Sequence, residues 1–232
     1  RFFSVNNGYF SEGVDRSITL TAASVIHEPF SDYDSDGADD WWLNGMNGGT
    51  GWASAWSCAA NIQHKVNAWG FGEGNRSIPT PSNRRGQLVA TANGSILSAD
   101  RYFTENFTTG VVYISWMMLY DHAGDSRFCG LHVLTDGGSD PAFIGKVAGS
   151  ANFGIDWSSD NRTSGRAAPN ATELFCVLKY DFDSDELFAS VYPPDSHVAE
   201  EPVGSLGEGA YWDVMTTQTI ASIKGIRIKG GV

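Results

Sequence analysis

The chain has 232 residues, 12% of them aromatic, with 15 Lys and Arg against 27 Asp and Glu and a net charge of -12. This length suits one large all-β domain. The acidic balance opposes binding to phosphate backbones and anionic membrane surfaces, and no stretch approaches the roughly 20 consecutive apolar residues of a membrane helix. We therefore expect neither nucleic-acid binding nor membrane insertion.

Strand candidates begin near the N-terminus, where the apolar runs are short, rich in β-branched and aromatic residues, and bounded by Gly, Asn, Asp and Pro. The upstream candidates are residues 17–23, 25–30 and 87–92. Long helical periodicity is absent from the sequence, so the chain is predicted to be all-β.

An acidic segment between residues 32 and 40 carries carboxylates at alternate positions, followed by Gly37. Such a loop can turn several oxygens toward one point, as Ca²⁺ requires. The pattern resembles the Asp-x-Asp-x-Asp-Gly loops of EF-hands and thrombospondin type 3 repeats, with Leu43 at the twelfth position where a bidentate Glu is expected. The resemblance predicts a calcium site formed by Asp32, Asp34, Asp36 and Asp40. The alternative is a solvated acidic turn without an ion.

Aromatic residues follow in polar, Gly-rich sequence. A ring can stack on the C–H face of a pyranose, although core packing is the commoner role of such side chains. We expect the loop residues Trp41, Trp42 and Trp69 to be carbohydrate-binding candidates, and Trp116 and Trp157, which lie in apolar runs, to belong to the core. Residues 44–51 are predicted to form tight turns with positive φ, and residues 52–85 to be largely irregular.

The central part of the chain holds the clearest strand pattern. Residues 110–120 are apolar on both alternating faces, which predicts a strand in the middle of a packed sandwich. Short connections between the following runs predict an antiparallel meander. Residues 220–229 are expected to add a closing strand, with Gly225 at a bulge or bend. The predicted meander strands are residues 128–134, 142–146, 152–157, 173–182 and 187–192.

Cys129 and Cys176 lie in apolar runs of this region and are expected to be buried thiols.

Three stretches together resemble the concanavalin A-like lectin/glucanase superfamily, and within it laminin G-like jelly-roll modules. They are residues 28–30 leading into the Asn-Gly-Met-Asn-Gly-Gly-Thr-Gly-Trp segment 44–52, residues 113–116, and the run from 130 to 193. The resemblance implies an antiparallel β-sandwich of the jelly-roll type over residues 25–232, with the acidic segment inserted before residue 44. Residues 1–24 are then an N-terminal extension that packs on the sandwich or completes it.

Catalytic signatures are missing from the sequence. Glucanases of this fold carry Glu-x-Asp-x-x-Glu on one strand, because retaining hydrolysis needs two carboxyl groups about 5 Å apart. No such triplet occurs, and the acidic run 181–186 fits a solvated hairpin, with a second ion site as the alternative. The five histidines lack zinc-ligand spacing. We therefore expect no enzyme activity.

Two functions from different classes remain. One is a non-catalytic, calcium-stabilised carbohydrate-binding module; the other is a structural or adhesive subunit that self-assembles through edge strands or its N-terminal extension. The partner is then a glycan or a neighbouring protein subunit, as in a homo-oligomer or polymer. An extracellular or cell-surface location is expected from five Asn-x-Ser/Thr sequons, which begin at Asn75, Asn93, Asn106, Asn161 and Asn170.

Overall fold

A computed structural model describes residues 26–28, 40–58, 62–66, 84–88, 96–120, 126–157, 160–169, 172–192 and 212–231. Within these residues the chain forms strands and no helix, and so has no helix long and apolar enough to cross a membrane. The strands are β1 (Asp40–Trp42), β2 (Ser57–Cys58), β3 (Ile62–Val66), β4 (Arg84–Leu88), β5 (Ile96–Phe107), β6 (Val111–Tyr120), β7 (Phe128–Leu134), β8 (Ala142–Lys146), β9 (Asn152–Trp157), β10 (Asp160–Ala167), β11 (Thr172–Asp181), β12 (Glu186–Tyr192), β13 (Val214–Thr217) and β14 (Ile223–Gly231).

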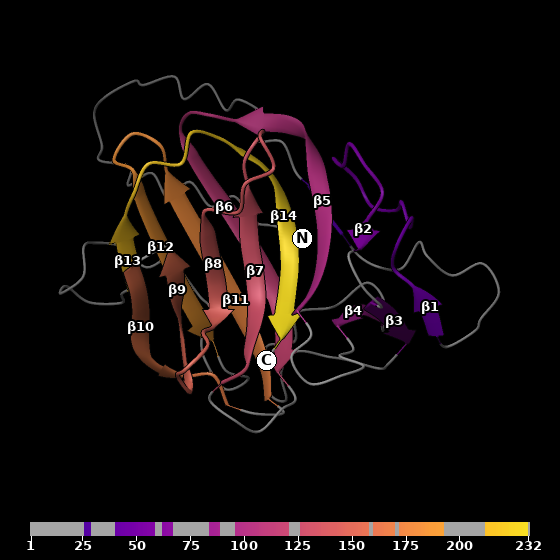
Figure 1. The fold of residues 1–232 in the computed structure, drawn as a ribbon. Helices are drawn as coiled ribbons and strands as arrows, with labels where there is room; N and C mark the ends of the chain where they lie inside the picture. The colour runs from indigo at the N-terminus through magenta and orange to yellow at the C-terminus, as the bar shows by residue number, and fades with distance from the viewer. Residues whose placement is uncertain are drawn as a thin grey trace, which may run out of the picture.

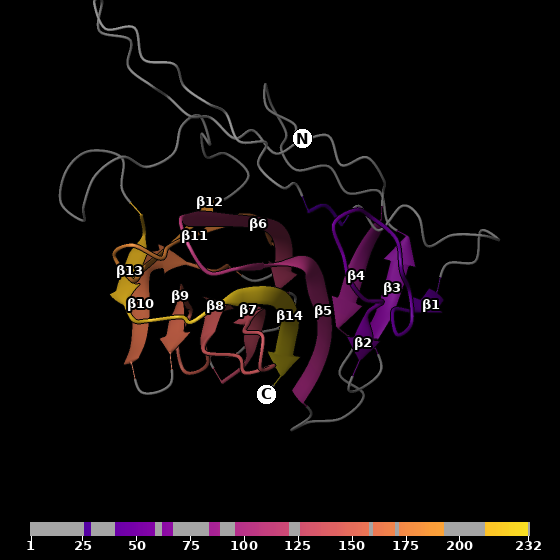
Figure 2. The same ribbon diagram turned by 90° about the horizontal axis from the view of Figure 1, so that it is seen from above.

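Two antiparallel sheets pack face to face (Figures 1 and 2). The larger has seven strands in the order β10-β9-β8-β7-β14-β5-β2, and the smaller has four in the order β13-β12-β11-β6. A three-stranded sheet, β1-β3-β4, lies beyond β5 at one side of the sandwich. The predicted fold class, an all-β antiparallel sandwich of the jelly-roll kind, is confirmed in this arrangement.

The core fills the space between the two large sheets. Successive side chains of a strand point to opposite faces, and the inward-facing residues of these strands are apolar and almost fully buried. Examples are Val133 in β7, Ile144 in β8 and Ile155 in β9, which meet Leu178 of β11 and Leu187 of β12, all with no exposed surface. Trp157, at 5% exposure, is a core residue as predicted, and Trp116 packs partly buried against the core.

Several predicted strands are found almost as expected. The bounds of β7, β8 and β9 coincide with the prediction, and those of β6, β11, β12 and β14 differ by a few residues. The strands do not form one continuous meander, however. β7 to β10 lie consecutively in the seven-stranded sheet, β11 to β13 in the other, and β14 returns to lie between β5 and β7. The simple meander prediction is therefore wrong at the points where the chain crosses between sheets.

Strand β5, twelve residues long, was not predicted. Its inward-facing side chains are Leu97, Ala99, Arg101 and Phe103, all nearly or fully buried. A small residue and an arginine at two of these positions hide the apolar alternation on which a strand prediction depends. Strands β10 and β13 were missed as well, and the upstream candidate 87–92 overlaps β4 by only two residues.

Strand β6 does not lie in the middle of the sandwich. It is the last strand of the four-stranded sheet as described, and its outward-facing Val111 and Tyr113 are 45% and 50% exposed. Its inward-facing Val112 and Met118 are buried, as expected. At this edge of the sheet, the outward-facing side chains of β6 are therefore apolar and yet exposed.

The glycine-rich segment 44–56 wraps around the buried Arg101. Its guanidinium donates to the backbone oxygens of Ser54 (3.1 Å) and Gly48 (2.6 Å), pairs with Glu28, and lies 4.5 Å from the centre of the Trp52 ring. Gly45, Gly49 and Gly51 have the positive φ angles predicted for this segment. In the stretch 52–85, which was expected to be largely irregular, Trp56 is a core residue and β2, β3 and the start of β4 are regular, while residues 59–61 and 67–83 lie outside the described residues.

Turns occur where small and acidic residues predict them. The β7–β8 connection contains Gly138 at φ +76°, and the acidic run 181–186 forms the predicted β11–β12 hairpin. In that hairpin Asp185 accepts hydrogen bonds from the Tyr180 hydroxyl (3.0 Å) and the Thr219 hydroxyl (2.9 Å). The bulge expected at Gly225 is confirmed by a register shift between Ile223 and Gly225.

Candidate functional site

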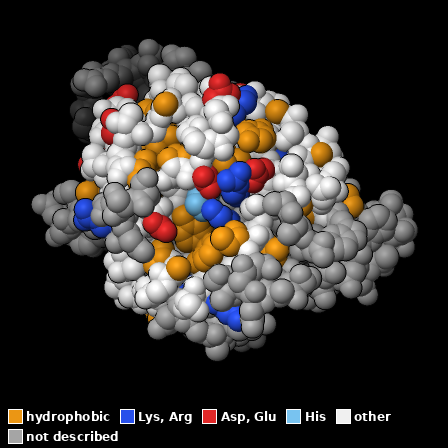
Figure 3. Space-filling model, in the orientation of Figure 1, with side chains coloured by type: hydrophobic (Ala, Val, Ile, Leu, Met, Phe, Trp, Pro, Cys, Tyr) orange, Lys and Arg blue, Asp and Glu red, His pale blue; other side chains and the backbone are white. Residues whose placement is uncertain are grey.

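A row of five polar and aromatic side chains crosses the outer face of the seven-stranded sheet. Direct cross-strand pairing places Asp100 of β5, Arg227 of β14, His132 of β7, Phe143 of β8 and Asp156 of β9 side by side. These residues alternate with core residues along each strand, and so they face away from the core. Figure 3 shows basic, acidic and histidine side chains gathered near the middle of this face, bordered by hydrophobic ones.

The neighbouring row of the same face is almost free of side chains. Gly130, Gly145 and Gly154 pair directly with one another across β7, β8 and β9, and Lys229 of β14 pairs with Gly130. A Cβ atom at Gly130 would lie 2.2 Å from the Ile144 carbonyl oxygen and 2.9 Å from Cζ of Phe143. The glycine thus lets β7 and β8 approach closely and lets the Phe143 ring lean over the strand.

A hollow of about 150 Å³ opens at these two rows. Aromatic side chains form part of it: the rings of Phe128 and Phe143 meet edge to face at 5.7 Å, and His132 lies 5.0 Å from Phe143 between ring centres. Phe143 and His132 are buried, Phe128 and Lys229 are partly exposed, and Asp156 is exposed. This outer-face hollow is lined by Phe128, His132, Phe143, Ala148, Asp156 and Lys229.

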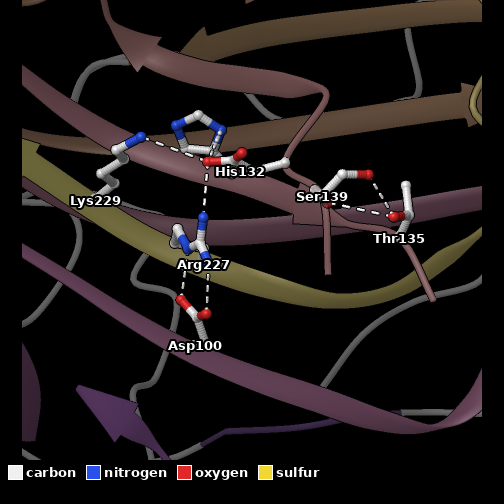
Figure 4. Close-up of polar contacts among 7 residues, drawn as sticks. Asp100, His132, Thr135, Ser139, Arg227 and Lys229 are labelled. Carbon is white, nitrogen blue, oxygen red and sulfur yellow. Dashed lines mark hydrogen bonds and ion pairs between the residues drawn. The ribbon is translucent and has the colours of Figure 1, made fainter. Parts of the chain in front are cut away.

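A charge network holds one side of the hollow in place (Figure 4). Arg227 donates two hydrogen bonds of 2.6 Å to Asp100 and a third of 2.8 Å to Oδ2 of Asp140, in the β7–β8 connection. Lys229 Nζ lies 3.4 Å from the same Asp140 oxygen. Charge-assisted bidentate pairs of this kind have fixed geometry. The network therefore fixes the β7–β8 connection to β14 and β5.

His132 is neutral at neutral pH. Burial lowers the pKa of His132 from 6.5 to about 4, and the positive charge of Lys229 adds a smaller effect in the same direction, while Asp140 opposes the shift. Its Nδ1 atom is buried 3.5 Å from Asp140 Oδ2 and makes no hydrogen bond. The contact is therefore not an ion pair at neutral pH, and the ring acts there as an aromatic and polar wall of the hollow.

Of the residues predicted from sequence as ligands, the structure describes Asp40, Trp41 and Trp42. Asp32, Asp34, Asp36 and Trp69 fall outside the described residues. Asp40, Trp41 and Trp42 form β1, of which only the backbone is described, and β1 pairs with β3 in the small sheet. Among the described residues, no three His, Cys, Asp or Glu side chains are grouped as a metal site. The calcium site and the loop-tryptophan site therefore stay predictions.

The outer-face hollow was not predicted from sequence. Its residues come from four strands, and each alone looks like an ordinary strand position. The available signal was the alternation in β7 to β9, where the glycines occupy the outward-facing positions and the core residues the inward-facing ones.

The predicted burial of Cys176 is confirmed, since it has no exposed surface, while Cys129 is only partly buried.

No protein-family model matches the chain, and no curated protein matches it significantly. Fourteen chains of solved structures match in fold. Among them, a Trypanosoma cruzi calreticulin globular domain is 9% identical over 76% of this chain and 78% of its own, with a TM-score of 0.43. The SPRY domain of human HERC1 is 15% identical over 60% and 82%, with a TM-score of 0.31. The lectin UEA-II, in complex with galactose, is 9% identical over 84% and 92%, with a TM-score of 0.40.

Proposed function

We propose that this protein is a non-catalytic carbohydrate-binding module whose site is the outer-face hollow. The observation that carries the proposal is the combination of exposed aromatic surface with separate hydrogen-bonding groups in one concave place. Phe128 offers partly exposed ring surface, Asp156 accepts hydrogen bonds and Lys229 donates them. Ligand sites of this kind join apolar lining with a few polar groups that set orientation.

The size of the hollow fits a weak, shallow site. At about 150 Å³ it is smaller than the roughly 300–1,000 Å³ of pockets that enclose drug-sized ligands. A sugar bound there keeps much of its surface in water and gains little from each contact. We therefore expect dissociation constants between millimolar and micromolar, which correspond to about -4 to -8 kcal/mol.

The charges at the hollow argue for binding rather than hydrolysis. Retaining and inverting glycosidases need a second carboxyl group opposite the first, about 5 to 9.5 Å away. Asp156 is the carboxylate that lines the hollow. Burial alone would raise the pKa of the nearby Asp140, but its contacts with His132, Arg227 and Lys229 outweigh burial and hold that pKa below the usual range. A carboxylate held ionised in this way is a poor general acid.

The test is binding of uncharged and acidic oligosaccharides, measured by titration calorimetry on the full chain and on Phe128→Ala. We expect at least one saccharide to bind, and Phe128→Ala to weaken its binding about tenfold, equivalent to about 1.4 kcal/mol, while the variant keeps a cooperative melting transition. Tyr113→Ala, a partly exposed aromatic on the other sheet, is the matched control and should keep wild-type affinity. Absence of binding across the panel at millimolar concentration contradicts the proposal.

A calcium ion and an extracellular location belong to the same proposal. In the sequence, Asp32, Asp34 and Asp36 precede β1 and Asp40 is its first residue, and Asn106, which begins a sequon, is exposed on β5. An ion that binds only the folded state raises stability, by about 2.7 kcal/mol at a hundredfold excess over Kd. EDTA should therefore lower the melting temperature, and Asp34→Asn should remove this effect. An identical melting curve with Ca²⁺ and with EDTA contradicts the calcium site.

A second candidate function, a self-assembling surface subunit, is favoured by β6. It is a ten-residue strand with exposed Val111 and Tyr113, and no other described strand pairs with its outer edge. Long apolar edge strands are templates for pairing with another chain. Sedimentation velocity over a hundredfold concentration range tests this function: growth of oligomers that Tyr113→Lys prevents supports it, and a monomer at every concentration rules it out.

A further inference from the structure

We propose that the outer-face hollow holds two or more consecutive rings of an uncharged, β-1,4-linked glycan, which lies across the strands from Asp156 to Lys229. This inference rests on the proposed carbohydrate-binding function. It adds the direction of the bound chain, its minimum length and its charge.

The direction follows from the two rows of the sheet. Gly130, Gly145 and Gly154 leave the outer face without side chains from β7 to β9, whereas along β7 the path is closed by Phe128 on one side and His132 on the other. The open path therefore runs perpendicular to the strands. A glycan that follows it passes over backbone and the Phe143 ring, with side chains on both flanks.

The length follows from the two polar ends. Asp156 lies on β9 and Lys229 on β14, and β8 and β7 separate these two strands. Asp156 is in the row of Arg227 and Lys229 is in the next row, two residues along the strands. Three interstrand spacings of about 4.8 Å and this offset of about 6.7 Å together place the two positions about 16 Å apart. One pyranose ring is too short to contact both ends at once, and two linked rings are long enough. A ligand that uses both ends must therefore have at least two rings.

The charge balance favours an uncharged ligand. Asp156 is exposed at one end of the hollow, and Arg227 is already bound to two carboxylates. Lys229 lies 3.4 Å from Asp140, so its positive charge is partly balanced. A uronate, sulfate or sialate would bring a second negative charge close to Asp156 in a chain of net charge -12, and like charges repel. Hydroxyl groups can donate to Asp156 and accept from Lys229 without this penalty.

The flat rings of a β-1,4-linked chain suit the lining of the hollow. In gluco- and xylo-configured chains the hydroxyl groups are equatorial, so each ring presents an apolar C–H face. Phe128 is partly exposed beside this path, and Phe143 leans over Gly130 beneath it. Apolar ring faces of the ligand and aromatic rings of the protein can then pack together while the hydroxyl groups at the edges reach the two polar ends.

The experiment measures affinity as a function of ring number by titration calorimetry. The probes are β-1,4-linked gluco-, xylo- and manno-saccharides of one, two and three rings, with a trimeric uronate as the charged comparison. We expect affinity to rise about tenfold from one ring to two in the series that binds, and the uronate to bind more weakly than the uncharged trimer. The full chain with Ca²⁺ present is used throughout.

Variants at the two ends make the test specific. Asp156→Asn and Lys229→Met should each weaken two-ring binding about tenfold, whereas single-ring binding should be lost in only one of them, because a single ring contacts one end. Asp183→Asn and Lys224→Met, an exposed acid in the β11–β12 hairpin and a lysine at the start of β14, are the matched controls. Lys229→Gln, which keeps a hydrogen-bond donor, should restore part of the affinity and serves if the Met variant does not fold.

The outcomes separate this inference from the proposed function. Affinity that does not change with ring number, equal losses of single-ring binding in both end variants, or preference for the uronate overturns the inference and leaves carbohydrate binding intact. Absence of binding by every saccharide contradicts both. Length-dependent binding with the two expected variant effects supports the inference.

Discussion

Arg101 shows how a single buried charge organises a segment that has little regular structure. Its side chain is fully buried, and burial lowers its pKa from 12.5 to about 10. Its partners Glu28, Asn47 and Gly48 are far from it in sequence. A fully buried cation is stable only if such partners compensate for the loss of water. The arginine therefore holds the glycine-rich segment in one conformation.

We predict that Arg101→Met destabilises the protein by about 3 to 5 kcal/mol, because it leaves the Glu28 carboxylate without its buried partner. Chemical denaturation measures the change. Arg166→Met is the control: Arg166 is 60% exposed and pairs with Asp213, and such surface pairs contribute only about 0 to 1 kcal/mol. Equal losses in the two variants would show that burial of Arg101 has no special weight.

His132 gives a pH dependence with a defined sign. Its folded-state pKa of about 4 lies below the ordinary value of 6.5, so between these values the unfolded chain binds a proton that the folded chain does not. Stability therefore falls as pH decreases from about 6.5 to about 4, by at most about 3 kcal/mol from this group. The groups facing it are Asp140, Lys229 and Arg227.

Denaturation between pH 4 and pH 8 measures this slope. His132→Gln removes the titrating ring, and we predict that the loss of stability between pH 6.5 and pH 4.5 becomes smaller in this variant than in the wild type. A wild-type free energy of unfolding that is constant or increases as pH falls over this window contradicts the assignment of a neutral, buried His132.

At the scale of elements, the glycines of β7, β8 and β9 determine how closely these strands pack. We predict that Gly130→Ala destabilises the protein by about 1 to 3 kcal/mol, because its Cβ would lie 2.2 Å from a β8 carbonyl oxygen and overpacked sites cost about this much. Gly165→Ala in β10 is the control, since no atom lies within 4 Å of its added Cβ. Thermal melting compares them. A Gly165 variant as unstable as the Gly130 variant would show that close strand approach is not the cause.

The elements also show where sequence patterns are informative. β7, β8 and β9 were predicted at their observed bounds because each joins an alternating apolar face to a clear turn. β5 was missed because Ala99 and Arg101 occupy inward positions, and the partners of Arg101 lie about 50 to 70 residues away in sequence. No local pattern can reveal that such an arginine is neutralised by a distant glutamate. β6 was misplaced because composition does not distinguish an edge strand from a central one.

The candidate site was even harder to predict from local sequence patterns than the strands were. Acidic and tryptophan-rich stretches can be recognised in a sequence because their residues are contiguous. The predicted calcium and carbohydrate ligands were therefore taken from such stretches. The outer-face hollow instead combines residues from β7, β8, β9 and β14, which become neighbours only when β14 pairs with β7. Lys229 and Phe128, for example, are about 100 residues apart in sequence. This non-local pairing is set by the whole sheet, and therefore could not be read from any one segment.

At the scale of the whole molecule, we expect the two faces of the sandwich to have different binding roles. The seven-stranded sheet presents a polar and aromatic hollow held by a charge network, and the four-stranded sheet presents the apolar edge of β6. The tryptophans of β1 belong to a third, separate sheet. A ligand that binds at one of these places should leave the other two unchanged.

The most direct test of the central claim is a map of amide chemical-shift changes during titration with the oligosaccharide that binds best. We predict that the largest changes fall on β7, β8, β9 and β14, around Gly130, Gly145 and Lys229, and that they saturate with a single dissociation constant matching calorimetry. Largest changes in β1, around Trp41 and Trp42, or along β6, with β7 to β9 unaffected, would contradict the placement of the site in the outer-face hollow.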